Sequence, residues 1–210
     1  MNLAGKKIKF PDSKILVFCK APIPGKVKTR LLPVLSSCEA ADLYRALAGR
    51  MIDCALGSSL AEIELWCYPD FNHPFFQKYN ECDVPLYQQQ GADLGERMYQ
   101  GAVHSLAQEG VNKVLIIGAD CPTLDEAYLD TALGKLKDHD AVLGPAEDGG
   151  YGLIGLSEAN PDVFSGITWS TSQVCADTCS RMNELNYNWS LLPLLWDVDR
   201  PEDLERLNHA

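Results

Sequence analysis

The segment KVLIIG (113–118) constrains the fold more than any other stretch of the chain. It is short, apolar and rich in strand-forming residues, and its interior has no polar residue to face solvent. A second run of the same kind, KILVFC (14–19), leads into a loop that contains proline and glycine. Strands of this composition are buried on both faces, as happens when helices cover both sides of a mostly parallel sheet. The two segments therefore predict an α/β fold.

Helix signals alternate with these strand-like runs. Ser36 and Glu39 have capping-box spacing, and apolar residues then recur every four positions. Three further helices are predicted to open at pairs with the same spacing: Asp93 with Glu96, Thr123 with Glu126, and Ser170 with Gln173. A short helix is expected at Pro201. The remaining predicted strands cover 62–68, 84–89, 140–145, 151–156 and 192–198. The alternation predicts a three-layer sandwich, and the glycine-rich turn EDGG makes its sheet mixed by joining two strands as a hairpin.

Length and charge exclude several classes of protein. The 210 residues fit a single domain, with residues 1–13 as a lead-in and residues 14–210 as the domain. The formal net charge of −11 argues against a general nucleic-acid binder or a protein of anionic membrane surfaces. No apolar run approaches the ~18–20 residues that span a bilayer, and we see no signal-peptide pattern. We therefore expect a cytoplasmic protein whose eight cysteines are reduced. The sequence carries no signal for the oligomeric state.

The loop after the first predicted strand, KAPIPGKVKTRL, is basic within an acidic chain. No acidic residue lies between positions 13 and 38. Proline and glycine keep the loop out of a helix and leave backbone N–H groups to face an anion, above all a di- or triphosphate. The candidate nucleotide-binding residues in this loop are Lys20, Gly25, Lys28 and Arg30. The alternative is a solvated basic loop, and the pattern is not that of a P-loop.

Carboxylates follow other predicted strands, at the edge where ligands bind in open α/β sheets. Asp120 follows KVLIIG and either caps a turn or holds Mg²⁺, which takes one or two protein carboxylates plus phosphate and water oxygens. Asp148 serves a metal, a sugar hydroxyl or general-base catalysis, or is only the turn residue before Gly149. Asp197 and Asp199 point the same way, and Asp199 is either a second metal carboxylate facing Asp120 or a helix N-cap. With the basic loop, these carboxylates suggest a clamp for a metal–nucleotide phosphate complex.

Six motifs, taken in this order, resemble one known family. They are KAPIPGKVKTRL, GADLGERM, GADCP, EDGGYGLIGL, WSTSQV and DVDRPEDL, and the match spans residues 14–207. They look like the bacterial glycosyltransferase-like proteins related to 2-phospho-L-lactate guanylyltransferase, which include transferases associated with arsenosugar biosynthesis. The wider group is the nucleotide-diphospho-sugar transferase superfamily. The resemblance implies its fold, a single-domain, Rossmann-like glycosyltransferase A sandwich with a mixed, mostly parallel central sheet.

The resemblance also implies where a nucleotide binds. The loop of Lys28 and Arg30 would hold the nucleotide phosphates. The motif GADLGERM would lie near the base and ribose, which makes Asp93 and Arg97 candidate nucleotide-binding residues. The alternative for Asp93 is that it only forms a capping box with Glu96.

A metal position follows from the same resemblance. Asp120 stands at the place of the Asp-x-Asp motif of glycosyltransferases, where Mg²⁺ or Mn²⁺ is bound, and Asp199 is similar in placement to a second ligand. This sequence departs from the family pattern in two places. Gly118 replaces the first carboxylate of the motif, and Arg200 stands where family members often have threonine.

The expected function is a metal-dependent glycosyl transfer from a nucleotide-diphospho-sugar to a small acceptor, with Asp148 removing the acceptor's proton. Gly149 and Gly150 are candidate substrate-binding residues, and Ser170 and Thr171 either cap a helix or bind a substrate anion at its N-terminus. The alternative is a guanylyltransferase-like nucleotidyl transfer, in which a small phosphorylated substrate attacks a nucleoside triphosphate and pyrophosphate leaves. A third interpretation is a non-catalytic nucleotide-binding module with a regulatory role.

Overall fold

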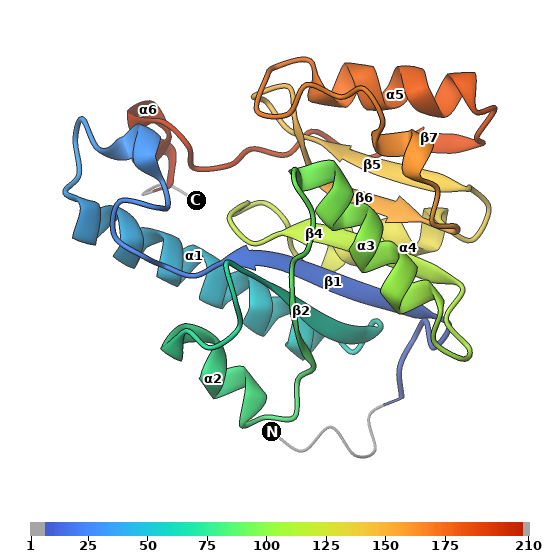
Figure 1. Cartoon of the computed structure of the whole chain (residues 1–210), viewed down its shortest axis with the longest axis horizontal. Helices are drawn as coiled ribbons and strands as arrows, with labels where there is room; N and C mark the ends of the chain where they lie inside the picture. Colours follow the sequence, from blue (N-terminus) through green and yellow to red (C-terminus); the bar gives the residue numbers. More distant parts are fainter. Residues whose placement is uncertain (1–6, 208–210) are drawn as a thin grey trace.

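The computed structural model describes residues 7–207 as a central sheet with helices on both faces (Figure 1). The first six residues of the expected lead-in and the last three residues of the expected domain lie outside the described residues. Within the described part, the seven strands form one sheet in the order β3-β2-β1-β4-β6-β5-β7. Strand β6 pairs antiparallel with β4 and with β5, and every other pairing is parallel. The prediction of a mixed, mostly parallel three-layer α/β fold is confirmed.

Strands and helices alternate along the described chain. The strands are β1 (Ser13–Lys20), β2 (Glu62–Tyr68), β3 (Leu86–Gln88), β4 (Lys113–Gly118), β5 (Ala141–Pro145), β6 (Tyr151–Leu156) and β7 (Trp189–Leu191). The helices are α1 (Ser37–Ser58), α2 (Pro74–Asn80), α3 (Leu94–Leu106), α4 (Glu126–Lys135), α5 (Val174–Glu184) and α6 (Pro201–Leu207). Two 3₁₀ turns are η1 (Thr29–Leu31) and η2 (Pro161–Phe164). Within the described part, no helix is both long and apolar enough to cross a membrane.

Burial on both faces explains why the central strands are apolar throughout. Along β1, Ile15 and Val17 pack into a core with residues of α1, α2 and α4. The intervening Leu16 and Phe18 pack into a second core with residues of α3, α5 and η2. Because successive side chains of a strand point to opposite faces, a strand between two helical layers needs an apolar residue at every position.

A third, smaller core lies beyond the carboxyl edge of the sheet. It joins Leu31 of η1 and Leu47 of α1 to Trp196 and Val198, in the segment that leads to α6. Leu31 and Val198 are fully buried there. Figure 1 shows the result, since α6 lies beside the loop that follows β1. This third core therefore fixes the basic loop next to the acidic segment 197–199.

The predicted strand at 192–198 is wrong. The last strand is β7, which ends at Leu191, and the following segment has only an isolated bridge between Ala146 and Leu195. Pro193 has no N–H group to donate to a ladder, and its carbonyl accepts the hydroxyl of Tyr128 at 2.7 Å. The segment therefore leaves the sheet early.

Two of the predicted helix starts are also displaced. Helix α4 is capped by Asp125, whose carboxylate accepts the N–H of Tyr128 at 2.8 Å, and not by Thr123. Helix α5 begins at Val174, and its N-cap residue is Gln173, which makes no side-chain cap; Ser170 lies outside the helix in a left-handed conformation at φ 66°. The predicted caps at Ser36 and Asp93 are confirmed. Helix α2 was not predicted, because its seven residues are too few to show the hydrophobic periodicity of a helix.

One polar network is buried between β1, β2 and α3. The side chain of Glu64 has 0% exposure and accepts a hydrogen bond from Lys14 Nζ at 2.8 Å. Its other donors are Ser105 Oγ at 2.7 Å, Gln108 Nε2 at 2.9 Å and Trp66 Nε1 at 3.2 Å. Burial raises the pKa of Glu64, but the hydrogen bonds from Lys14, Ser105 and Gln108 outweigh burial and leave that pKa below its usual range. Glu64 is thus a buried but fully paired anion.

We expect Lys14→Met to lower the free energy of unfolding by ~3–5 kcal/mol, because it leaves a buried carboxylate without a counter-charge. The matched control is Lys9→Met, which removes an ion pair to Asp130 whose side chains are 56% and 37% exposed. That control should cost about 1 kcal/mol or less. Urea unfolding at pH 7 measures both. The gap between the variants should narrow as the pH falls through the usual carboxyl range, because a protonated Glu64 no longer needs Lys14. Equal losses at pH 7 would contradict this interpretation of the network.

Candidate functional site

Oppositely charged residues meet at the carboxyl edge of the sheet. The basic loop follows β1, Asp120 follows β4, and Asp148 lies in the turn between β5 and β6. Asp197 and Asp199 come from the segment before α6, where the third core holds the buried Trp196 and Val198. Because buried and charged residues alternate in this segment, both carboxylates are directed away from the core.

One ion pair joins the basic loop to Asp120, which follows β4. Lys28 Nζ lies 2.8 Å from Asp120 Oδ2, with the Lys28 side chain 3% exposed and that of Asp120 39% exposed. Burial raises the pKa of Asp120, but the charges of Lys28 and, more weakly, Lys20 outweigh it and set the pKa below its usual range. Lys28 also adopts a left-handed conformation, with φ 47° and ψ 39°. A residue other than glycine rarely does so, and such strain is common at functional sites.

A second ion pair joins Arg30 to Asp199. It is more exposed than the first, since 52% of the Arg30 side chain and 22% of the Asp199 side chain are accessible. The hydrogen bond and charge of Asp199 raise the pKa of Arg30 further above its usual value. Asp199 is not the cap of α6. The N–H groups of Asp199 and Arg200 instead donate to Asp203 Oδ2, at 2.9 and 2.7 Å.

Asp197 is the carboxylate that the sequence analysis did not select. Among the described residues it has no hydrogen bond or ion pair. Burial, then the charges of Asp120, Asp148 and Asp199, raise the pKa of Asp197 to about 6, although Lys28 opposes them. The signal was present in the sequence as the alternation of Trp196, Asp197, Val198 and Asp199. The sequence could not show which of the two carboxylates would find a basic partner.

The turn that carries Asp148 is built around two glycines. Asp148 Oδ1 accepts the N–H of Gly150 at 2.8 Å, so Asp148 does form the expected turn bond. Gly149 has φ 87°, and a Cβ atom there would lie 2.1 Å from the carbonyl oxygen of Ser172. The carbonyl of Gly149 accepts the N–H of Cys175 at 2.9 Å. The turn is therefore locked onto the start of α5, while the charge of Asp148 still acts on Asp197.

Arg97 lies at the same sheet edge as the ion pairs. Its Nε donates to the carbonyl of Gly91 at 3.1 Å, and its guanidinium lies 4.2 Å from the ring centroid of Tyr68, the last residue of β2. Asp93 is used as the cap of α3, where it accepts the N–H of Glu96 at 2.8 Å. The capping interpretation of Asp93 is confirmed, and no contact of the described structure brings it to the ion pairs.

The remaining predicted residues surround this edge. Lys20 donates its backbone N–H to the hydroxyl of Tyr44 at 2.7 Å, and its charge acts on Asp120. Gly25 has φ 75° and open space around it. Thr171 Oγ1 donates to the carbonyl of Thr168 at 2.8 Å. Ser170 does not cap α5, so that interpretation of Ser170 is wrong.

The donor set fits a metal ion that arrives with other ligands. Within residues 7–207, no three acidic, cysteine or histidine side chains are grouped closely enough to hold a metal ion by themselves. Asp120 and Asp197 nevertheless interact through their charges, and no cation of the described residues forms an ion pair with Asp197. Mg²⁺ commonly takes one or two protein carboxylates and completes its shell with phosphate and water oxygens. The residues therefore suit Mg²⁺ or Mn²⁺ that is bound together with a phosphate group.

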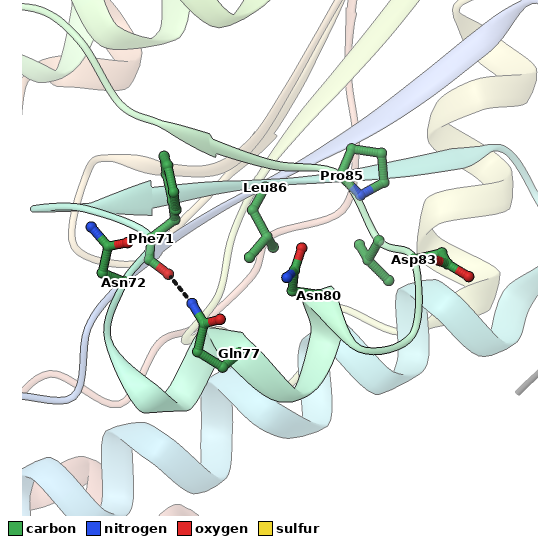
Figure 2. Close-up of a pocket in the computed structure, with 8 residues that line it drawn as sticks. Phe71, Asn72, Gln77, Asn80, Asp83, Pro85 and Leu86 are labelled. Carbon is green, nitrogen blue, oxygen red and sulfur yellow. Dashed lines mark hydrogen bonds between the residues drawn. The ribbon is translucent and has the colours of Figure 1, made fainter.

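A cavity of about 360 Å³ lies elsewhere, between α2 and β3 (Figure 2). Its walls are Phe71, Asn72, Gln77, Asn80, Asp83, Val84, Pro85 and Leu86. Figure 2 shows Gln77 donating to the carbonyl of Phe71 across one end of the cavity, at 2.9 Å. The lining contains an acidic residue and no basic one, so it does not suit a phosphate group.

Comparison with known proteins points to transferases. The family model described as "Uncharacterized protein conserved in bacteria (DUF2064)" matches residues 51–171. A candidate nucleotide-diphospho-sugar transferase of Desulfovibrio desulfuricans G20 is similar with 36% identity and a TM-score of 0.84, over 94% of this chain and 86% of that chain. The search of curated proteins gives no match.

Two more distant structures share the fold. A CMP:2-keto-3-deoxy-manno-octonic acid synthetase complexed with CTP has 12% identity and a TM-score of 0.57, over 94% of this chain and 97% of that chain. Rv0371c of Mycobacterium tuberculosis H37Rv, in complex with manganese, has 13% identity and a TM-score of 0.54, over 95% and 99%.

The raised pKa of Asp197 predicts a particular pH dependence. Between pH 4 and the pKa of about 6, the folded protein holds a proton on Asp197 that the unfolded chain has lost, so the stability falls as the pH rises. Asp197→Asn removes this pH-dependent loss of stability, because asparagine does not titrate. In buffer with EDTA, the variant should melt at the wild-type temperature at pH 4 and at a higher temperature at pH 7.5.

The exposed Asp138→Asn controls for the loss of one negative charge. It should follow the wild type at both pH values. If Asp197→Asn melts no higher than the wild type at pH 7.5, then Asp197 is not under the repulsion described above.

The packing of Gly149 predicts a large effect of one methyl group. Gly149→Ala combines a left-handed backbone, at ~1–2 kcal/mol, with a clash that costs another ~1–3 kcal/mol. Gly25→Ala is the matched control, since Gly25 has φ 75° and no atom within 4 Å of the added methyl group. Denaturant unfolding should show a loss of ~2–5 kcal/mol for Gly149→Ala and ~1–2 kcal/mol for Gly25→Ala. Equal losses would mean that the contact with Ser172 is not tight.

Proposed function

Because the chain belongs to the bacterial family described as "Uncharacterized protein conserved in bacteria (DUF2064)" and is 36% identical to a candidate nucleotide-diphospho-sugar transferase, we propose that it is a metal-dependent glycosyltransferase. Its donor is a nucleotide-diphospho-sugar and its acceptor is a small molecule. The observation that carries this proposal is the meeting of Lys28 and Arg30 with Asp120, Asp197 and Asp199 at one sheet edge. A diphosphate with its metal ion has the complementary charges for both groups.

In this proposal the basic loop binds the donor's diphosphate. Lys28 and Arg30 donate hydrogen bonds to phosphate oxygens, and Arg30 is able to do so with two parallel bonds. Gly25 and Lys20 shape and charge the same loop. Arg97, fixed by Gly91 and stacked on Tyr68, lies two strands from Asp120 and supports the nucleoside end of the donor.

The carboxylates hold the metal and activate the acceptor. Asp120 and Asp197 supply oxygen ligands, and Asp199 serves as a ligand only if it exchanges Arg30 for the ion. Mg²⁺ or Mn²⁺ held by these carboxylates would supply positive charge to stabilise the departing nucleoside diphosphate. Asp148 lies in the turn beside this edge and accepts the proton of the acceptor hydroxyl. Gly149, Gly150, Ser170 and Thr171 line the acceptor side, where the turn meets the start of α5.

Nucleotidyl transfer is the second candidate. In that reaction a small phosphorylated substrate attacks the α-phosphorus of a nucleoside triphosphate, as in a guanylyltransferase. The clustering of Lys20, Lys28 and Arg30 favours it, because leaving pyrophosphate carries more charge than a nucleoside diphosphate linked to a sugar. The fold likeness to a synthetase complexed with CTP also supports this candidate.

A thermal-shift panel with Mg²⁺ or Mn²⁺ tests the proposal. We expect a nucleotide-diphospho-sugar or nucleoside diphosphate to raise the melting temperature, and EDTA to abolish the shift. Preference for a nucleoside triphosphate, with release of pyrophosphate, would support nucleotidyl transfer instead. No shift with any nucleotide would contradict both reactions and the non-catalytic nucleotide-binding module.

Asp148→Asn separates catalysis from architecture. Asparagine keeps the oxygen that accepts the N–H of Gly150, so the turn should survive. If Asp148 is the general base, turnover falls by ~10²–10⁴-fold while donor affinity, measured by calorimetry, stays the same. A joint loss of turnover and affinity would make Asp148 a metal ligand, and retention of both would leave it only the turn residue.

A further inference from the structure

We propose that Lys28 and Asp120 form an electrostatic latch through which the protein binds a metal ion and a diphosphate together and binds either one alone weakly. The latch is the ion pair between Lys28 Nζ and Asp120 Oδ2, at 2.8 Å. The inference rests on the proposed function, because it concerns how the two halves of that same site are coupled.

The latch is closed in the structure. Lys28 is almost fully buried, and among the described residues Asp120 is the sole hydrogen-bond or ion-pair partner of its ammonium group. The left-handed backbone of Lys28 and the burial of the neighbouring Val27 and Leu31 hold this lysine at the sheet edge. Asp120 in turn lies two residues after Gly118, the end of a strand that is buried on both faces. Both partners are therefore held by rigid parts of the fold.

Each partner of the latch is needed elsewhere when the site is filled. The proposed metal ion requires the Asp120 carboxylate, and the proposed phosphate requires the Lys28 ammonium group. A metal ion that binds alone is repelled by the buried ammonium group of Lys28, which is already paired with the Asp120 carboxylate. A diphosphate alone draws Lys28 away and leaves Asp120 uncompensated beside Asp197 and the phosphate charges. In a partly buried site such uncompensated charge is costly.

Binding both ligands removes this cost. Lys28 turns from Asp120 to a phosphate oxygen, and Asp120 exchanges the ammonium group for the metal ion. Every charge then has an opposite neighbour, so each ligand raises the affinity for the other by the same factor.

Burial distinguishes this pair from the other ion pair of the site. The Arg30 side chain is 52% exposed, so its pair with Asp199 is screened by solvent and opens easily. The Lys28 side chain is 3% exposed, so solvent screens its pair with Asp120 far less. Asp197 meanwhile offers a carboxylate that forms no ion pair within residues 7–207. The latch is therefore the Lys28–Asp120 pair rather than the general mixture of charges at this edge.

The first test measures Mn²⁺ alone, by electron paramagnetic resonance, without any nucleotide. Lys28→Met keeps the length of the side chain and removes its charge. We expect this variant to bind Mn²⁺ about tenfold more tightly than the wild type, as the loss of one charged hydrogen bond allows. The matched control is Lys20→Met, since Lys20 acts on Asp120 only through its charge. That control should change the affinity by about threefold or less, as expected for a screened charge.

The second test measures inorganic pyrophosphate in EDTA, by calorimetry. Asp120→Asn releases Lys28, so this variant should bind metal-free pyrophosphate about tenfold more tightly than the wild type. Asp148→Asn is the control, because it removes a nearby negative charge that has no contact with Lys28. Circular dichroism and melting curves establish that each variant is folded.

The proposal requires that Lys28→Met binds Mn²⁺ more tightly and that Asp120→Asn binds pyrophosphate more tightly than the wild type does. If either variant binds its probe no better than the wild type, or no better than its control, the proposal is overturned and Lys28 contributes only to the general charge of the site. These probes contain no base or sugar. The two binding tests can therefore support the latch even if the thermal-shift panel contradicts the proposed function. They can also contradict the latch while the panel supports the proposed function.

Discussion

The burial of β1 and β4 on both faces is the constraint on which the rest of the structure depends. These neighbouring strands lie between two helical layers, and their interiors accept no charged group that lacks a partner. Glu64 on the adjacent strand β2 shows the condition under which a charge is admitted, since four donors surround it. All other chemistry is displaced to the strand ends. The carboxyl ends of β1 and β4 emerge side by side there, which brings the basic loop to Asp120.

The third core extends this logic beyond the sheet. Leu31 anchors the basic loop, and Trp196 and Val198 anchor the acidic segment, within one small apolar cluster. Because charged residues alternate with these anchors, burying the anchors turns the charges toward each other. Arg206 links α6 to both parts of this edge. Its guanidinium lies over the ring of Trp196 and forms an ion pair with Glu147, in the turn beside Asp148. Hydrophobic packing thus sets the distances between charges that would otherwise be held only by solvent-screened attraction.

The sequence predicted what depends on local pattern. The apolar runs, the caps at Ser36 and Asp93, and the hairpin at EDGG all follow from a few neighbouring residues, and they were correct. The pairing of Lys28 with Asp120 and of Arg30 with Asp199 joins residues 92 and 169 positions apart, which no local pattern encodes. Asp199 was predicted as a metal ligand from the family resemblance, and the local pattern did not distinguish it from Asp197. Asp197 and Asp199 are two positions apart, so the sequence predicts that they lie on the same side. Only the fold determines that Asp199 meets Arg30 and that Asp197 lies among other carboxylates.

The antiparallel strand β6 affects the entropic cost of bringing the parts of this sheet edge together. It makes β5 and β6 a hairpin closed by a few residues, whereas the register of β1 on β4 pairs Ser13 with Lys113 and so closes a far longer loop. Short loops close at a smaller entropic cost, so forming the β5–β6 hairpin and its turn costs less chain entropy than pairing β1 with β4. A chain in which β1 is not paired with β4 can keep the turn that carries Asp148, but it does not bring Lys28 to Asp120.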